Sequence, residues 1–195
     1  SLRALGIGPG DEVILPAHAP APVIEPIVYV GAVPVLIDKA RDDYGPDLTS
    51  LQSAITSKTK AVMAVHLLGL PCDMESIGRI AAEHGIPVVE DSSQAQGAMY
   101  RDKRAAGLGI ITPMSLGSVK NLACYGDGGV VLTNDDALAQ TVRLLRVHGQ
   151  AVASDLEGRT FEHDPKYLNM RVGMNSRMDT IQAAVLLQKL AIFGD

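Results

Sequence analysis

Two short stretches of the chain carry an acid and a lysine in surroundings suited to chemistry. Residues 88–97 are a β-branched run that stops at Glu90 and Asp91 and breaks into small polar residues. Residues 115–121 bring Lys120 into a turn rich in glycine and serine. A lysine that forms a Schiff base and a carboxylate that partners the pyridinium nitrogen are the two parts of a pyridoxal phosphate site. We therefore take pyridoxal phosphate chemistry as the leading hypothesis.

Each residue alone has an ordinary structural explanation. Acids often end strands as helix caps, and most lysines are solvated surface charges. Together they gain weight, because Lys120 follows glycine and serine, which let a backbone approach a phosphate, and Ser115 and Ser118 offer hydroxyl donors. The spacing of a Walker phosphate loop is missing.

The elements that must position these residues alternate along the chain. Apolar runs indicate buried strands, and helical periodicity with Gly and Pro stops indicates helices between them. We expect strands at 12–15, 33–37, 61–65, 86–90, 110–115 and 129–133, and helices at 21–30, 47–55, 73–85, 134–147 and 176–191. This rhythm predicts an α/β fold of three layers, α/β/α, with a mostly parallel sheet. Such sheets bind ligands beyond the carboxyl ends of their strands, where His18, Asp38, His66 and Asp91 lie.

Several local features are also predicted. Asp47, Asp73 and Asn134 are expected to cap helices. We expect residues 176–179 to form a capping box for the last helix, whose buried face would carry Ile181, Ala184, Val185 and Leu187. Residues 150–170 are polar and without period, which indicates a long exposed loop.

Composition excludes several classes of partner. A net charge of −5 and a pI near 5.5 argue against nucleic acid and against acidic phospholipid surfaces. Cys72 and Cys124 form no metal-ligand spacing and no disulfide framework, so no metal site is expected and a reducing, cytoplasmic setting fits. No apolar run would span a bilayer, and the first residues lack a signal-peptide layout. Both ends of the chain look cut.

From Leu5 to about Leu190 the chain resembles the large, cofactor-binding domain of the DegT/DnrJ/EryC1/StrS sugar aminotransferases, within the fold type I pyridoxal phosphate enzymes. The likeness rests on blocks in the family's order and spacing: residues 5–14, 59–62, 65–69, 90–95, 120–122, 126–129, 145–149 and 173–179. It implies that residues 1–195 form the large domain, without the family's upstream phosphate-binding segment and its C-terminal small domain. It also implies pyridoxal 5'-phosphate as the cofactor.

The resemblance assigns roles to individual residues. Lys120 falls on the Schiff-base lysine, which also moves the proton between substrate and cofactor, and Asp91 falls on the partner of the pyridine nitrogen. Gln94 falls near the ring hydroxyl, and Ser115 matches a phosphate-binding serine. Asn175 matches an asparagine that reaches the phosphate of the neighbouring subunit's cofactor, which implies a homodimer with shared active sites.

Some other positions near the expected site depart from the family's pattern. Arg177 is expected to help bind substrate across the same interface, or to be a structural ion-pair partner. The position of the family's ring-stacking aromatic is Pro20 here, so that His18 takes over part of the stacking or is an ordinary loop histidine. The family's Phe-Ser-Phe strand is 114–116, with Met and Leu around the serine, and its Leu-Gly-Asp is 108–110, with Ile in place of the acid.

The implied activity is transfer of an amino group, from glutamate or glutamine, to a keto group of a nucleotide-linked sugar or a cyclitol. One alternative is a sugar dehydratase of the same family, which would carry histidine at the lysine position, so that Lys120 argues against it. A second alternative is a non-catalytic fragment or remnant that keeps the fold and the dimer surface. The truncated ends and Pro20 favour that alternative, and the set of Asp91, Ser115, Lys120 and Asn175 opposes it.

Overall fold

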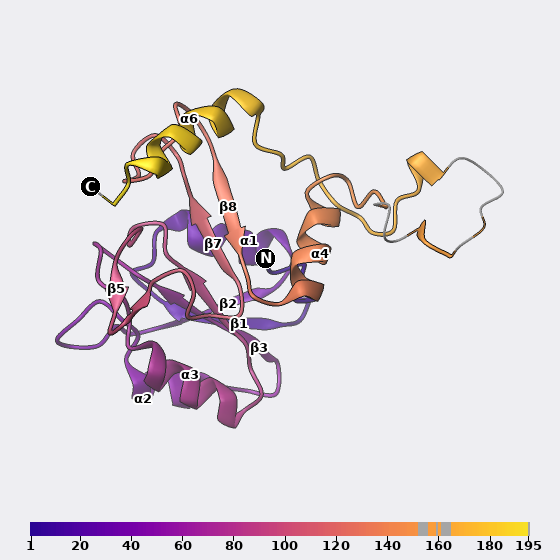
Figure 1. Ribbon diagram of the computed structural model, residues 1–195. Coiled ribbons are helices and arrows are strands. Elements are labelled where there is room, and N and C mark those ends of the chain that lie inside the picture. Colours follow the sequence, from indigo (N-terminus) through magenta and orange to yellow (C-terminus); the bar gives the residue numbers. More distant parts are fainter. Residues whose placement is uncertain (152–155, 159, 161–164, 195) are drawn as a thin grey trace.

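A parallel sheet forms the centre of the protein. The computed structural model describes residues 1–151, 156–158, 160 and 165–194 (Figure 1). Four parallel strands lie in the order β2-β1-β3-β4, namely β1 (Glu12–Pro16), β2 (Val33–Ile37), β3 (Thr59–Val65) and β4 (Val88–Asp91). The first two predicted strands and the third therefore lie where the apolar runs indicated. The fourth is displaced by one or two residues from the predicted 86–90.

The sheet continues beyond β4 through a second pair of strands. β7 (Thr112–Ser115) pairs antiparallel with β8 (Gly129–Leu132). Ile111, just before β7, forms a parallel bridge with Val89, and its carbonyl accepts the Glu90 N–H at 3.1 Å. A small hairpin of β5 (Met99–Tyr100) and β6 (Lys103–Arg104) lies in the connection. The expected mostly parallel sheet is confirmed, with β8 as its antiparallel member.

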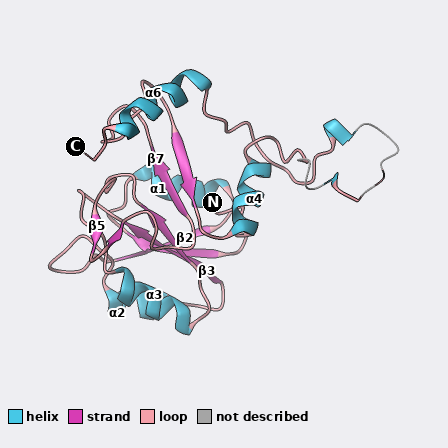
Figure 2. Cartoon of the chain, in the orientation of Figure 1, coloured by secondary structure: helices cyan, strands magenta, loops and turns pink. Residues whose placement is uncertain are grey.

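Helices cover both faces of the sheet, because the side chains of β1 alternate between two apolar clusters. Val13 and Leu15 pack in one cluster with α1 (Ala21–Tyr29), and Ile14 packs in the other with α2 (Leu48–Ala54) and α3 (Met74–Glu83). Figure 2 shows α2 and α3 together beneath the sheet and α1 on the opposite side. These three layers are the predicted α/β/α arrangement.

Two of the three predicted single-residue helix caps, Asp47 and Asp73, are confirmed. Asp47 accepts the Ser50 N–H at 2.7 Å, and Asp73 accepts the Ser76 N–H at 3.3 Å. The prediction of Asn134 as a cap was wrong, because Asp135 caps α4 (Asp136–Leu145) by accepting the Leu138 N–H at 2.9 Å. The Thr133 hydroxyl accepts the Asp135 N–H at 3.1 Å, and this turn brings the aspartate into the capping position.

The predicted capping box of the last helix was also wrong. α6 (Thr180–Ala191) is capped by Asp179, which accepts the Gln182 N–H at 2.9 Å. Ser176 instead donates its N–H to the Arg146 carbonyl at 2.9 Å, so it belongs to a backbone pairing with the end of α4. A long-range contact has therefore displaced a local motif.

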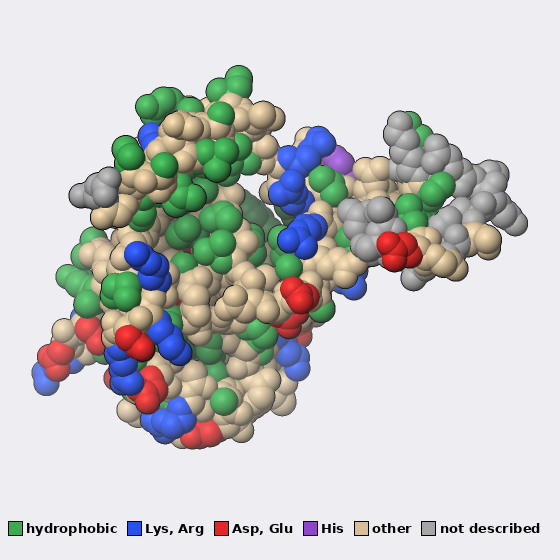
Figure 3. Space-filling view, in the orientation of Figure 1, with side chains coloured by type: hydrophobic (Ala, Val, Ile, Leu, Met, Phe, Trp, Pro, Cys, Tyr) green, Lys and Arg blue, Asp and Glu red, His purple; other side chains and the backbone are tan. Residues whose placement is uncertain are grey.

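The face that α6 buries differs from the predicted one. Ile181 is 75% exposed, Leu187 is 66% exposed and Ala184 is exposed, whereas Leu186 is buried. Figure 3 shows hydrophobic side chains gathered on the outer surface over α6. The helix turns Gln182 and Lys189 inward instead, because both bind the backbone of residues 123–125. Among the described residues, no helix has the length and apolar character needed to cross a membrane.

An arm leaves the body after α4 and returns before α6 (Figure 1). Its two sides pair through backbone hydrogen bonds, including His148 N–H to Met174 O at 3.0 Å and Met170 N–H to Gly149 O at 2.7 Å. Gly149 has a φ of 72°, and a Cβ there would overlap the Arg171 carbonyl, so only glycine fits. In the predicted loop 150–170, residues 152–155, 159 and 161–164 lie outside the described residues, and a short 3-10 helix, η1 (Pro165–Tyr167), lies near its end.

Candidate active site

The carboxyl edge of the sheet collects most of the predicted site residues. Asp91 is the last residue of β4 and Ser115 the last residue of β7. His66 follows β3 directly, and His18 lies two residues after β1. Because β1, β3 and β4 are parallel and Ile111 pairs parallel with β4, all four residues lie at the same edge.

Three side-chain hydrogen bonds hold the loop that follows β4 and join it to its neighbours at this edge. The Asp91 carboxylate accepts the Ser93 N–H at 2.9 Å, which closes the turn after the strand. The Ser93 hydroxyl accepts the Ser115 N–H at 2.9 Å, and the Gln94 carbonyl oxygen accepts the Leu68 N–H at 3.1 Å. Residues 91–97 are therefore joined to the end of β7 on one side and to the loop after β3 on the other.

The loop that carries Lys120 belongs to the same connected group. Lys120 is half-buried, and its N–H donates to the Gly117 carbonyl at 2.9 Å. The Gln96 side chain donates to the Ser115 carbonyl at 2.8 Å and accepts the Leu122 N–H at 2.6 Å. Hydrogen bonds thus join the loops of Asp91, Gln94, Ser115 and Lys120, although these residues lie up to 29 positions apart along the chain (120 − 91).

The functional groups at this edge fit pyridoxal phosphate. The carboxylate of half-buried Asp91 can hold the proton on a ring nitrogen, and the amine of half-buried Lys120 can bond covalently to an aldehyde. The Gln94 amide nitrogen can donate to a ring hydroxyl while its oxygen stays on Leu68. The Ser115 hydroxyl can donate to a phosphate oxygen, because its one bond to the backbone is accepted from Gly117 at 3.3 Å.

The sequence predicts no role for Glu90, yet its side chain accepts several hydrogen bonds. Its side chain is fully buried. It accepts hydrogen bonds from His66 Nε2 at 2.9 Å and from the N–H groups of Leu108 at 2.8 Å and Gly109 at 2.9 Å. Burial raises the pKa of Glu90, but the bonds from His66 and from these backbone N–H groups outweigh it and hold the pKa at about 2. The buried carboxylate is therefore ionised.

The hydrogen bonds around His66 determine which ring nitrogen carries the proton. The Cys72 N–H donates to His66 Nδ1 at 3.1 Å, so Nδ1 is the acceptor and Nε2 carries the proton that Glu90 accepts. Burial, then the charge of Asp43, raises the pKa of the Cys72 thiol to about 12, which keeps it protonated. The one signal for Glu90 in the sequence was its position next to Asp91, since alternation along a strand places the two carboxylates on opposite faces.

The remaining predicted residues lie apart from this group. His18 Nε2 is hydrogen-bonded to the Tyr44 carbonyl at 2.9 Å, and Pro20 is the N-cap of α1. Asn175 is exposed at the root of the arm, where its carbonyl oxygen accepts the Arg177 Nε–H at 3.2 Å. In the described part of the chain, none of the hydrogen bonds of His18, Asn175 and Arg177 reaches residues 91–97. Their roles therefore stay predictions.

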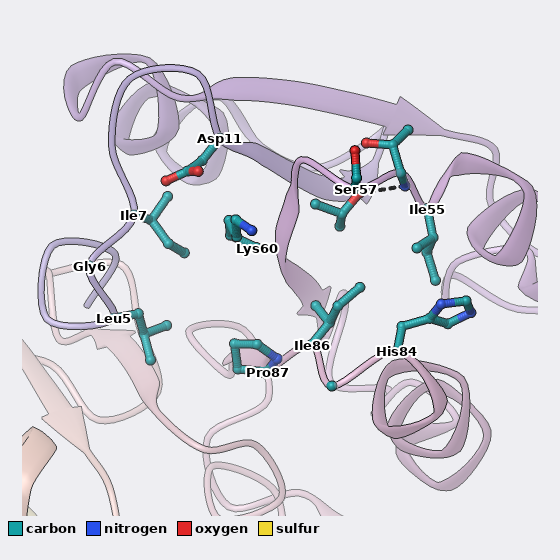
Figure 4. A pocket seen from close by; sticks show the side chains of 13 residues that line it. Leu5, Gly6, Ile7, Asp11, Ile55, Ser57, Lys60, His84, Ile86 and Pro87 are labelled. Atoms are coloured by element: carbon teal, nitrogen blue, oxygen red, sulfur yellow. Dashed lines mark hydrogen bonds between the residues drawn. The ribbon is translucent and has the colours of Figure 1, made fainter.

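A hollow lies at the opposite, amino edge of the sheet. Its volume is about 820 Å³, and Asp11, Thr59 and Pro87, which border it, lie at or just before the starts of β1, β3 and β4. Figure 4 shows Leu5, Ile7, Ile86 and Pro87 as apolar side chains around it, with Lys60 near its middle. The volume of a hollow alone therefore does not identify the chemical site.

Over the residues that the structure describes, no group of three or more His, Cys, Asp or Glu side chains could hold a metal ion.

Comparisons with known proteins point to one family. Residues 1–194 match the model of the DegT/DnrJ/EryC1/StrS aminotransferase family. The chain is 44% identical, over 98% of its length and 50% of the relative's, to a UDP-2-acetamido-2-deoxy-3-oxo-D-glucuronate aminotransferase of Pseudomonas aeruginosa. It is 42% identical, over 97% of its length and 47% of the relative's, to a pleiotropic regulatory protein of Geobacillus stearothermophilus.

Solved structures agree with the fold. The structure of S. venezuelae DesV in complex with a ketimine intermediate matches with a TM-score of 0.89 and 40% identity, over 99% of this chain and 48% of that one. The structure of NtdA from Bacillus subtilis with bound cofactor PMP matches with a TM-score of 0.83 and 31% identity, over 98% and 41%. The predicted fold class, the large domain of the type I pyridoxal phosphate-dependent transferases, is confirmed. The chain spans about half the length of the relatives that it matches.

Proposed function

Because the chain belongs to the DegT/DnrJ/EryC1/StrS aminotransferase family, we propose that it is the pyridoxal phosphate-binding large domain of an aminotransferase. Its acceptor would be a keto group on a nucleotide-linked sugar or a cyclitol, and its amino donor glutamate or glutamine. The observation that carries the proposal is the set of hydrogen bonds that join the loop of Asp91 to the loop of Lys120. The name of the Pseudomonas aeruginosa relative, an aminotransferase of a UDP-linked keto sugar, supports the substrate class.

Bound pyridoxal phosphate would supply an electron sink for the bonds broken at the substrate carbon. Asp91 would keep the ring nitrogen protonated, since a carboxylate favours the charged form of its partner. Lys120 would hold the cofactor through its amine and, once the amino group of the substrate had displaced it, would carry the proton between substrate and cofactor. Gln94 would orient the ring through its amide, and Ser115 would bind the phosphate.

The partner residues extend the proposal to a homodimer. Asn175 and Arg177 lie exposed at the root of the arm, where a second copy of the chain can reach them. Asn175 would donate its amide to the phosphate in the partner's site, and Arg177 and His18 would contact the substrate. The two buried free thiols, Cys72 and Cys124, agree with a reducing cytoplasmic setting.

An absorbance spectrum of the purified protein after addition of pyridoxal phosphate tests the proposal. We expect a band near the edge of the visible range that borohydride makes permanent, and mass spectrometry should place the added mass on Lys120. The Lys120→Ala variant should show neither. Lys103→Ala, which removes an exposed lysine of β6, should behave as wild type. A band that survives in Lys120→Ala, or no band in wild type, would contradict the proposal.

A regulatory role without catalysis is the second candidate, and the regulatory protein of Geobacillus stearothermophilus among the relatives favours it. Amino transfer from glutamate distinguishes the two, because a regulatory protein would bind the cofactor without turnover. Lys120 disfavours the dehydratase alternative, since a sugar dehydratase of this family would carry histidine at that position.

A further inference from the structure

The loop that carries Lys120 has little regular structure of its own. Residues 117–123 form no helix or strand, and Val119, next to the lysine, is 88% exposed. The loop is closed at its base, where the Cys124 N–H donates to the Leu116 carbonyl at 2.8 Å. Between these ends, the position of the lysine depends on side chains that bind the loop from outside.

Gln96 is the side chain that binds it nearest to the lysine. It is only 8% exposed, and its amide makes three hydrogen bonds. Its oxygen accepts the Leu122 N–H at 2.6 Å, and its nitrogen donates to the carbonyls of Leu122 at 3.4 Å and Ser115 at 2.8 Å. One amide thus pairs with both backbone groups of Leu122, as a neighbouring strand would, and ties that residue to the end of β7.

We propose that Gln96 is a positioning residue that fixes the Lys120 amine relative to Asp91. This inference rests on the proposed function. Gln96 lies five residues after Asp91 and binds Leu122, two residues after Lys120, so it spans the two loops directly. Reactive groups must be held to within about 0.5 Å, and a displacement of about 1 Å costs roughly 100-fold in rate. A neutral amide is required, because an ionised carboxylate has no donor for the Ser115 carbonyl.

A second glutamine offers a matched control. Gln182 of α6 pairs in the same way with both backbone groups of Tyr125, accepting its N–H at 2.7 Å and donating to its carbonyl at 3.3 Å. Tyr125 lies five residues after Lys120 and beyond the closed base of the loop. Loss of Gln182 therefore removes equivalent bonds without freeing the lysine.

The test compares Gln96→Met and Gln182→Met with wild type. The first readout is the rate at which added pyridoxal phosphate becomes bound through Lys120, followed by absorbance. The second is amide hydrogen exchange of residues 117–123 without cofactor, and thermal unfolding is followed in parallel. We expect Gln96→Met to slow covalent binding about tenfold or more and to speed exchange in this segment, whereas Gln182→Met should stay within about twofold in both.

A Gln96→Met variant that binds the cofactor at the wild-type rate would overturn the inference, even if exchange became faster, because Gln96 would then be only structural. Equal losses in both variants would overturn it as well. Gln96→Glu, which keeps the acceptor for Leu122 but not the donors, gives the same comparison if the Met variant does not fold. If wild type itself never binds the cofactor through Lys120, the proposed function fails, and the exchange measurement still decides whether Gln96 holds the loop.

Discussion

The two ends of the parallel sheet differ in the kind of contact that shapes them. At the amino end, apolar side chains such as Leu5, Ile7 and Ile86 border an open hollow of about 820 Å³. At the carboxyl end, polar side chains bind the backbone of neighbouring loops, as Ser93, Gln94 and Gln96 do. The hollow lies at one end, and the polar groups that fit the proposed chemistry lie at the other.

This difference shows what makes a site in a fold of this type. A parallel sheet leaves loops at its carboxyl edge whose backbone groups need partners, and short polar side chains after each strand supply them. Those bonds hold carboxylate, amide, hydroxyl and amine groups in fixed positions. Side chains at the hollow also bind backbone N–H groups, as Asp11 binds that of Gly8 and Thr59 that of Thr56, but these bonds join residues only three positions apart and do not connect neighbouring loops.

The largest expected difference between the two ends is in the free energy of unfolding that is lost when a buried or an exposed glutamate is replaced. Glu90→Ala leaves the donors of His66, Leu108 and Gly109 without their acceptor and should lower the free energy of unfolding by about 3 to 5 kcal/mol. Glu83→Ala, near the amino edge, removes an exposed ion pair with Arg79 and should cost less than about 1 kcal/mol. Denaturant unfolding measures both, and equal costs would remove the contrast.

The same glutamate should make stability depend on acid pH. Its native pKa of about 2 lies below the ordinary 4.5, so folding favours the ionised form. The stabilisation is complete above pH 4.5 and is lost as pH falls toward 2, by about 3 kcal/mol in all. Unfolding measured from pH 6 to 2 should show this slope in wild type.

In Glu90→Gln that part of the slope should disappear. A residual slope should remain, because hydrogen bonds from Ser50 and Ser76 also lower the pKa values of Asp47 and Asp73. An unchanged profile in Glu90→Gln would show that Glu90 is not the group responsible.

Substitutions at two glycines should change the free energy of unfolding by smaller amounts. A Cβ at Gly109 would lie 2.8 Å from the Val88 carbonyl, so Gly109→Ala should push the loop away from β4 and cost roughly 1 to 3 kcal/mol. Gly78, within α3, has nothing within 4 Å of such a Cβ, and Gly78→Ala should add about 0.5 to 1 kcal/mol of stability. Thermal unfolding should therefore move in opposite directions in the two variants.

The smallest effect is expected at the hollow itself. Lys60→Ala removes an exposed lysine from its lining and should change the free energy of unfolding by less than about 0.5 kcal/mol. The pyridoxal phosphate spectrum should match that of wild type. A lost or shifted band would mean that the amino edge takes part in cofactor binding and would undo the comparison.

Most of the fold could be predicted because its signals are local. The strand at 33–37 lies where an apolar run indicated, and Asp47 and Asp73 cap helices as their positions suggested. Local patterns failed where distant segments compete. Ser176 pairs with Arg146 instead of capping α6, and α6 turns Gln182 and Lys189 inward because they bind the backbone near Tyr125.

By itself, the sequence determined the order of the strands along the chain, the parallel character of the sheet and the candidate pair of Asp91 and Lys120. Periodicity and punctuation encode these features within a few residues of each position. Only the tertiary structure decided that Glu90 is a buried, ionised anchor and that Gln96 joins the two loops. The physical reason is that most of their partners lie 16 to 26 residues away, and hydrogen bonds over such separations leave no period in the sequence.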